Sequence, residues 1–314
     1  MAEHRLHAGV GAKAGPLHFP GTNDGDLVRI LQADVAALAG EIGERNTRRY
    51  ENLERAAAFV RESFEAAGCS VHQHRYRADG QDCQNLIVEM EGIGDAHQVV
   101  VVGAHYDSVR GAPGANDNAS GVAALLALAR RLAGSRLNRT IRFAAFVNEE
   151  PPYIRTQQMG SLVYAQACRA RKDNIVAMLS LETIGCFPSY DPPPGVPRAA
   201  RLLKPVQGNF LALVSNVRSR WLGRRVAAGF RRASPLPVRT FALPGFLPGV
   251  RSSDHWAFWQ CGYPAVMVTD TAPFRYPFYH TRYDTPDKIS YRALADVVHG
   301  LRAAVIGLAV GDRP

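Results

Sequence analysis

The strongest constraint on the fold is an alternation of strand-like and helix-like segments that begins near residue 98. The segment QVVVVGAH (98–105) contains four consecutive valines, a pattern typical of a strand that is covered on both faces. A glycine-rich bend follows, and then VAALLALARRLAG (122–134), which has helical periodicity. Such alternation predicts an α/β fold with a central, mostly parallel mixed sheet and helices on both faces.

The same patterns predict the remaining elements. Strands are predicted over 70–78, 84–92, 140–150, 175–185, 209–216 and 264–270. Helices are predicted over 26–42, 52–68, 160–171, 218–233 and 291–309. Neither an internal repeat nor a break in composition divides these segments. We therefore expect one domain over residues 25–314, preceded by an irregular arm over 1–24 that lacks periodicity.

Composition excludes several classes of protein. The chain has 314 residues, 46% of them hydrophobic, which is ample for a large core. Its formal net charge is +9, and the helix 218–233 carries six arginines. No aromatic platform accompanies these arginines, so we interpret them as a solvated face and expect no nucleic-acid partner. The five cysteines form no CxxC pair, which favours a reducing compartment, although one disulfide stays possible.

The chain shows no targeting segment. Its first 24 residues contain no continuous apolar run, and no later segment reaches the roughly 18 apolar residues of a membrane helix. We expect a cytoplasmic protein without a membrane partner, or a periplasmic or secreted one if a leader has been removed. The oligomeric state is not predicted.

Acidic residues and histidines follow four of the predicted strands. They are His105, Asp107 and Asp117, then Glu149 and Glu150, then Glu182, and finally His280. Parallel strands bring their carboxyl ends to one edge of a sheet, where ligands bind in α/β folds. Imidazole and carboxylate groups without cysteine are the ligands of a catalytic zinc or of a two-metal hydrolytic site.

The bend GAHYDSVRGAPGANDNASG (103–121) has the chemistry of a metal-binding loop. Asp107 follows His105 by two residues, so its carboxylate can hold the ring nitrogen that faces away from a metal. The glycines allow the backbone to turn sharply around an ion.

Seven motifs together resemble a known family. They are GAHYDSV, GANDNASG, VNEEPP, MGS, SLETIG, SDHWAFW and YHTRYDTPDKI, which extend from about residue 99 to 289. In order and spacing they resemble the zinc aminopeptidases of metallopeptidase family 28, which include bacterial leucyl aminopeptidases and aminopeptidase Y. Glutaminyl cyclases are divergent relatives. The resemblance implies the phosphorylase/hydrolase-like fold of that family and covers residues 1–50 poorly.

The resemblance also implies a role for each motif residue. His105 would bind one zinc ion, Asp117 would bridge two, and Glu150 and His280 would bind the other. Glu149 would be the general base, and Asp107 would support His105. The peptide after the bridging aspartate is cis in the family, which predicts a cis Asp117–Asn118 bond.

One ligand position departs from the family pattern. Glu182 stands where the family usually has Asp, as the last ligand of the first zinc. The extra methylene changes the reach by about 1.5 Å, so the resemblance leaves open whether the chain binds one zinc ion or two.

The segment 240–260 ends in a predicted capped helix that begins near Ser252 or Ser253. We place Asp254 behind the ligands, with His255 beside it but not as a ligand. Four apolar residues here either line a substrate pocket or belong to the core: Phe246, Leu247, Trp256 and Phe258.

The resulting hypothesis is a zinc aminopeptidase that acts on peptides with a free N-terminus. One alternative is a glutaminyl cyclase-like acyltransferase that uses one zinc, and another is a hydrolase of other amides. A binding module that has lost the metal is disfavoured because no ligand position is apolar. The preferred N-terminal side chain is not predicted.

Overall fold

The computed structural model describes residues 24–187 and 209–311. The predicted N-terminal arm lies outside these residues, except for Asp24, which begins the first helix. The described strands are β1 (Val71–Ala78), β2 (Gln81–Met90), β3 (Gln98–His105), β4 (Thr140–Phe146), β5 (Asn174–Glu182), β6 (Leu211–Ser215), β7 (Val238–Ala242) and β8 (Ala265–Thr269). The described α-helices are α1 (Asp24–Val35), α2 (Tyr50–Ala66), α3 (Gly121–Leu132), α4 (Gly160–Ala170), α6 (Arg220–Phe230), α7 (His255–Gln260), α8 (Ala272–Arg275) and α9 (Tyr291–Val310). Short helical turns are η1 (Ala36–Ile42), η2 (Thr47–Arg49), η3 (Ala115–Ser120) and η4 (Pro286–Lys288).

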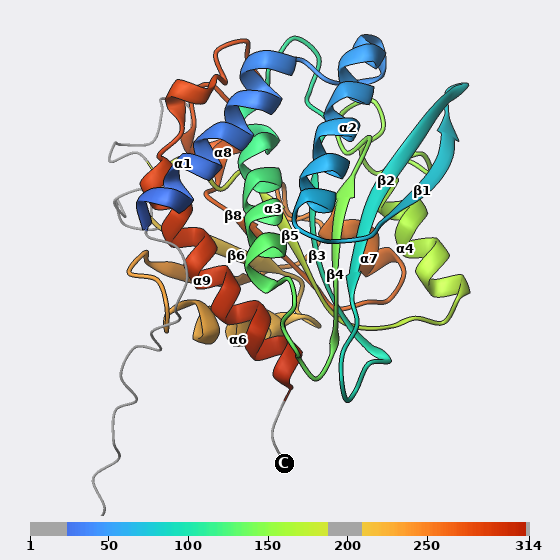
Figure 1. Ribbon diagram of the computed structural model, residues 1–314, viewed down its shortest axis with the longest axis vertical. Coiled ribbons are helices and arrows are strands. Elements are labelled where there is room, and N and C mark those ends of the chain that lie inside the picture. The colour runs from blue at the N-terminus through green and yellow to red at the C-terminus, as the bar shows by residue number, and fades with distance from the viewer. Residues whose placement is uncertain (1–23, 188–208, 312–314) are drawn as a thin grey trace, which may run out of the picture.

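The strands form one eight-stranded sheet in the order β1-β2-β4-β3-β5-β8-β6-β7 (Figure 1). The four central strands, β4, β3, β5 and β8, are parallel to one another. Antiparallel pairs flank them, β2 on β4 at one side and β6 on β8 at the other. The predicted mixed sheet with a parallel centre is therefore confirmed, and its parallel strands are the ones that precede the candidate site residues.

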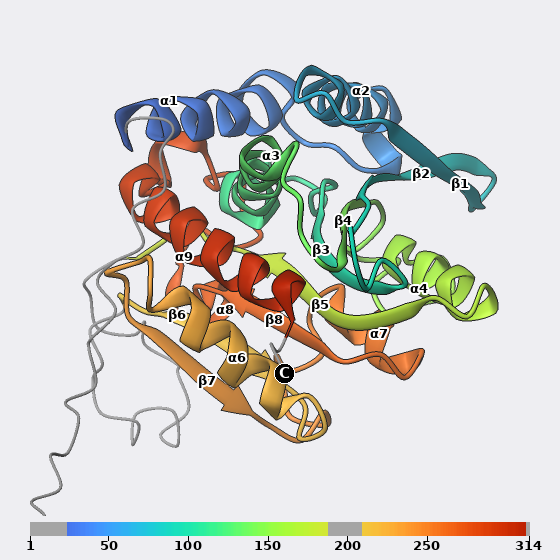
Figure 2. The ribbon, with the colours of Figure 1, turned by 60° about the horizontal axis from the view of Figure 1, so that its bottom comes forward.

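Helices cover both faces of the sheet, as the valine strand predicts (Figure 2). Val100 and Val102 of β3 pack in a cluster with residues of α1, α2, α3, α6 and α9. Val99 and Val101, which point the other way, pack with residues of α4 and α7. Because successive side chains of a strand alternate between faces, an unbroken apolar run is needed to fill both layers.

Helix α9 is the most apolar long helix of the described residues. By length and mean hydropathy, 1.6 over an 18-residue window, it would suffice to cross a membrane. Here it is packed against α1, α3 and α6, with ten of its residues buried. Its apolar character is therefore accounted for by the core.

Three sequence predictions differ from the structure. The helix predicted to begin with a capping residue near Ser252 or Ser253 begins at His255, and its first turn has no side-chain cap hydrogen bond. The strand predicted over 140–150 ends at Phe146, because Asn148 takes a left-handed backbone with φ 58° that no strand can continue through. Glu149 and Glu150 thus lie on a loop and not on an extended strand end. Strand β7 was not predicted, since this edge strand buries only Val238 fully and has no apolar run. The five cysteines are all free.

Candidate metal and catalytic centre

The candidate residues gather at the carboxyl ends of the four parallel strands. His105 and Glu182 are the last residues of β3 and β5. Glu149 and Glu150 follow β4, and His280 lies in the segment after β8 and α8. The sheet topology thus brings together residues that are up to 175 positions apart in the chain.

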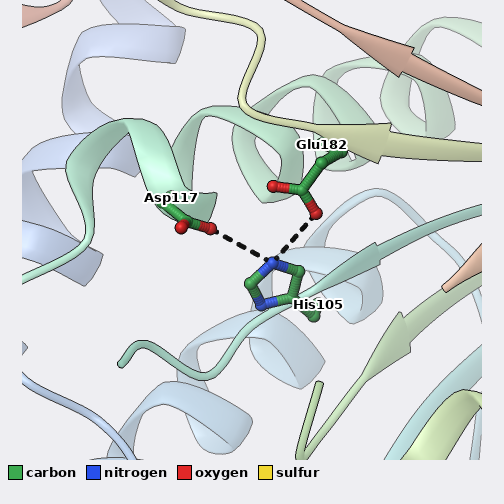
Figure 3. Close-up of side chains that lie close together, drawn as sticks. All are labelled: His105, Asp117 and Glu182. Atoms are coloured by element: carbon green, nitrogen blue, oxygen red, sulfur yellow. Dashed lines mark ion pairs between the residues drawn. The ribbon is translucent and has the colours of Figure 1, made fainter. Parts of the chain in front are cut away.

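His105 is central to a first group of three side chains (Figure 3). Its Nε2 atom lies 3.3 Å from Oδ1 of Asp117 and 3.3 Å from Oε2 of Glu182. The three donor atoms lie within 4.8 Å of one another, and all three residues are buried. A metal ion could therefore be bound by one nitrogen and two carboxylate oxygens.

A second group shares Asp117 with the first. The other carboxylate oxygen of Asp117, Oδ2, lies 3.0 Å from Nε2 of His280. The same His280 nitrogen lies 3.3 Å from Oε2 of Glu150. Asp117 thus turns one oxygen toward each group, which is the geometry of a bridging carboxylate.

Buried polar atoms without partners test whether a metal fits these groups. Nε2 of His105, Oε1 of Glu149 and Oε1 of Glu150 are fully buried and make no hydrogen bond within the described residues. Leaving such atoms unsatisfied costs several kcal/mol, roughly 2–7 by transfer measures. Metal coordination would give the His105 nitrogen and the Glu150 carboxylate partners, and imidazole with carboxylate is a ligand set that zinc accepts. The residues present therefore fit divalent ions.

The pKa values of the clustered side chains also indicate a cation site. Burial, with the charge of Asp117 next, raises the pKa of Glu150 to about 7. Although burial opposes it, hydrogen bonding to Asp117 and Glu150 raises the pKa of His280 to about 10. Burial likewise raises the pKa of Glu182. The buried carboxylates lie close together, so their combined negative charge attracts a cation.

Glu149 lies beside both groups but belongs to neither. Its Oε2 atom is 3.9 Å from Nε2 of His105, further than the oxygens of Asp117 and Glu182. Burial raises the pKa of Glu149 well above its ordinary value. A carboxylate near a metal but outside its ligand set is free to accept and return a proton.

The longer side chain of Glu182 is held in place by a hydroxyl group. Ser253 Oγ donates a hydrogen bond of 2.8 Å to Glu182 Oε2, the oxygen that faces His105. The extra methylene is therefore accommodated, and the departure from the family's Asp does not remove the carboxylate from the site.

Asp107 connects two loops of the site. Its Oδ1 atom lies 3.4 Å from Nδ1 of His105, on the ring side away from the first group. Its two oxygens also accept the backbone N–H groups of Glu149 and Glu150, at 3.2 and 3.1 Å. Asp107 thus orients the His105 ring and the pair of glutamates together.

Asp254 and His255 of the SDHWAFW motif differ in their hydrogen bonding. Asp254 is fully buried, and burial raises its pKa to about 7, yet neither of its oxygens bonds to a candidate ligand in the described residues. His255 Nε2 lies 2.8 Å from the Val250 carbonyl, and burial lowers the pKa of the ring to about 4. His255 is in neither of the two groups of candidate ligands among the described residues.

The four apolar residues left open between pocket and core divide into two pairs. Trp256 and Phe258 are buried in the cluster on the α4 and α7 face. Phe246 is 77% exposed and Leu247 is 37% exposed. Phe258 is core, Trp256 packs in the core and also lines a surface pocket, and the second pair is exposed to solvent.

Sequence reasoning missed three residues that contact or surround the centre. Asp284 accepts the backbone N–H groups of Asn116 and Asp117, at 2.8 and 3.0 Å. Tyr279 stacks on His280, and burial together with the carboxylates of the site raises its pKa. Arg45 is the third. The signal for the first two was their place within YHTRYDTPDKI, whereas Arg45 lies outside every motif.

The backbone of the metal loop also agrees with the family pattern. The Asp117–Asn118 peptide is cis, as the resemblance predicts. Gly114 has φ 64°, and a Cβ atom there would lie 2.2 Å from the Asp117 carbonyl oxygen. Only glycine fits this turn.

Comparison with known proteins gives consistent results. The sequence model described as Peptidase family M28 matches residues 85–192 and 230–305. The uncharacterized protein YfbL of Escherichia coli (strain K12) is 35% identical over 283 residues, which cover 86% of this chain and 85% of YfbL. A probable zinc metalloprotease of Pyrenophora teres f. teres (strain 0-1) is 29% identical over 212 residues, 59% of this chain and 41% of the relative.

Solved structures share the fold at low sequence identity. The zinc aminopeptidase BSAP from Bacillus subtilis has a TM-score of 0.71 at 17% identity and covers 91% of this chain and 96% of its own. A glutaminyl cyclase from Fimbriiglobus ruber has a TM-score of 0.64 at 21% identity and covers 94% and 99%. Two different activities therefore occur on this fold, and the likeness alone does not distinguish between them.

Proposed function

Because this chain belongs to peptidase family M28, we propose that it is a zinc-dependent aminopeptidase that removes N-terminal residues from peptides. The observation that carries the proposal is the sharing of Asp117 between the two ligand groups. Two ions bridged at roughly 3.5–4 Å are typical of hydrolytic two-metal sites, aminopeptidases among them. Zinc held there would lower the pKa of a water molecule toward about 7 and polarise the scissile carbonyl.

Each of this chain's own residues then has a distinct task. His105 and Glu182 would hold one ion, Glu150 and His280 would hold the other, and Asp117 would contribute one oxygen to each group. Glu149 takes the proton of the attacking water and returns it to the leaving amine, since it lies next to both groups without being part of either. Buried carboxylates attract a protonated α-amine, which favours substrates with a free N-terminus.

A one-zinc glutaminyl cyclase is the second candidate, because structures with that activity share the fold. The complete first group, His105 with Asp117 and Glu182, favours the two-metal peptidase.

A paired assay on the zinc-loaded protein separates the candidates. We expect release of chromophore from an aminoacyl anilide and no cyclisation of a peptide with N-terminal glutamine. The opposite result would establish the cyclase, and a protein that binds no zinc in solution would be neither.

A further inference from the structure

Arg45 is a fully buried arginine whose donors are directed at backbone carbonyl groups. It lies between η1 and η2, far in sequence from the metal loop. Nε donates to the Tyr106 carbonyl at 2.6 Å, and Nη2 donates to the Gly114 carbonyl at 2.9 Å. Nη1 donates to the Pro113 carbonyl and, on the N-terminal side, to that of Gly43 at 3.2 Å. The guanidinium thus holds both ends of the segment 106–114.

Backbone contacts next to Arg45 hold the middle of this segment. The Ser108 N–H donates to the Arg45 carbonyl at 2.9 Å, and the Arg45 N–H donates to Ser108 Oγ at 3.1 Å. Asn46 Nδ2 donates to the Ser108 carbonyl at 3.1 Å. Residues 45 and 46 therefore act as a scaffold for the loop that connects His105 to Asp117.

The positive charge of Arg45 lies near the carboxylates of the metal centre. Burial lowers the pKa of Arg45 to about 10, while Asp107, Asp284 and Asp117 act in the opposite direction. The guanidinium therefore stays charged at neutral pH. In the described residues the guanidinium forms no ion pair with a carboxylate. The nearby negative charges belong to the metal centre and to Asp284, which accepts the backbone N–H of Asp117.

From these contacts we propose that Arg45 is a positioning residue of the metal centre. By fixing segment 106–114, it holds Asp107 and Asp117 in the geometry that zinc requires, and so it determines zinc affinity. This rests on the proposed function. Residues 24–84 lie outside the region that matches the family model, so the assignment comes from the contacts of this chain.

The test compares zinc binding by the metal-free wild type and by Arg45→Met, through competition with a chromophoric chelator. We expect a loss of affinity of about 10–100-fold, the effect typical of residues that orient metal ligands. Arg45→Lys keeps the charge but lacks the planar fork, so most of the loss should persist. At saturating zinc, kcat should fall while KM changes little. Amide hydrogen exchange of the metal-free variant should accelerate in segment 106–114.

Arg130→Met is the matched control. Arg130 pairs with Asp34 through hydrogen bonds of 2.5 and 3.2 Å and so joins α3 to α1 in the same helical layer. Within the described residues, no hydrogen bond or ion pair connects Arg130 to the loop between His105 and Asp117. It should lower thermal stability but leave zinc affinity unchanged. If it weakens zinc binding as much as Arg45→Met does at a similar loss of stability, Arg45 has only a general structural role and the inference is wrong.

Further outcomes are equally decisive. Should Arg45→Met fail to fold, Ser108→Ala replaces it, because that change removes the hydroxyl between Arg45 N–H and the Ala112 carbonyl. Wild-type zinc affinity in a folded Arg45→Met, or in Ser108→Ala as its replacement, would overturn the inference but not the proposed function. A wild type that binds no zinc overturns both.

Discussion

Glu149 and Glu150 are adjacent in sequence but differ in their surroundings. Glu150 lies 3.3 Å from His280 within the second group, whereas Glu149 is outside both groups. We therefore predict that Glu149→Gln keeps the fold and zinc but loses about 10²–10⁴-fold in turnover, the usual contribution of a positioned general base. Turnover and zinc stoichiometry, measured side by side, test this.

Glu150→Gln is the complementary variant. It removes a charged oxygen from the second group, so zinc affinity should fall first and added zinc should restore part of the activity. If Glu149→Gln loses zinc while Glu150→Gln keeps it, the two roles are reversed.

Asp270 gives a prediction about pH. Its Oδ2 accepts hydrogen bonds from Asn116 Nδ2 and the Cys186 N–H, at 2.9 and 2.8 Å, while its Oδ1 has no partner in the described residues. Burial raises its pKa from 3.8 to about 8. Between these values the unfolded chain binds fewer protons than the folded one, so stability declines as pH rises, by at most about 1.4 kcal/mol per pH unit.

Asp270→Asn cannot ionise and should lack this decline. We expect the free energy of unfolding of the wild type to fall relative to the variant between pH 5 and pH 8, in chelator-treated samples. Parallel pH profiles would show that the carboxyl ionises freely in the folded protein.

Single site residues were predictable where the side chain is itself of a type that binds metal ions. His105, Asp117, Glu150 and His280 stand out because nitrogen and oxygen ligands follow strands. Arg45 and Asp284 act on backbone carbonyl and N–H groups instead, and every residue has those groups. Asp284 stands inside a motif and Arg45 does not, but no spacing in the sequence marks the partners of either residue, so only the folded chain shows what they contact.

At the scale of elements, the metal loop depends on one glycine more than on another. Gly114→Ala should lower stability by about 1–3 kcal/mol through its left-handed backbone, and should weaken zinc binding because the added Cβ meets Asp117 and Ser108. Gly111→Ala is the control, with φ 81° but no atom within 4 Å of the new Cβ. Denaturant unfolding and zinc titration separate the two; equal zinc affinities would contradict the prediction.

Strands and helices were predictable where most of their residues are buried and therefore apolar. The four consecutive valines of β3 predict a strand that is buried on both faces, and in the structure they pack between two layers of helices. The end of β4 was not predictable, because the left-handed backbone of Asn148 is set by tertiary contacts such as its hydrogen bond to Tyr76. Strand β7 is half exposed at a sheet edge, so hydrophobic patterning carried little information about it.

For the whole molecule, metal removal should lower stability. An ion that binds only the folded state, at 100 times its Kd, stabilises it by about 2.7 kcal/mol. For a chain of this size we expect chelation to lower the unfolding temperature by on the order of 5–10 °C, with recovery when two equivalents of zinc are returned. Calorimetry with elemental analysis measures both; recovery at one equivalent would favour a single-ion enzyme.

The shared carboxylate of Asp117 has a consequence for how such a chain can diverge. A substitution at Asp117 damages both groups at once, since each relies on one of its oxygens. Under the proposed two-zinc function, a descendant that binds one ion would arise most directly through changes at His105 and Glu182, or at Glu150 and His280, because either pair belongs to one group alone. Among the candidate ligands of the described residues, Asp117 is the one position at which a single substitution would alter both groups at once.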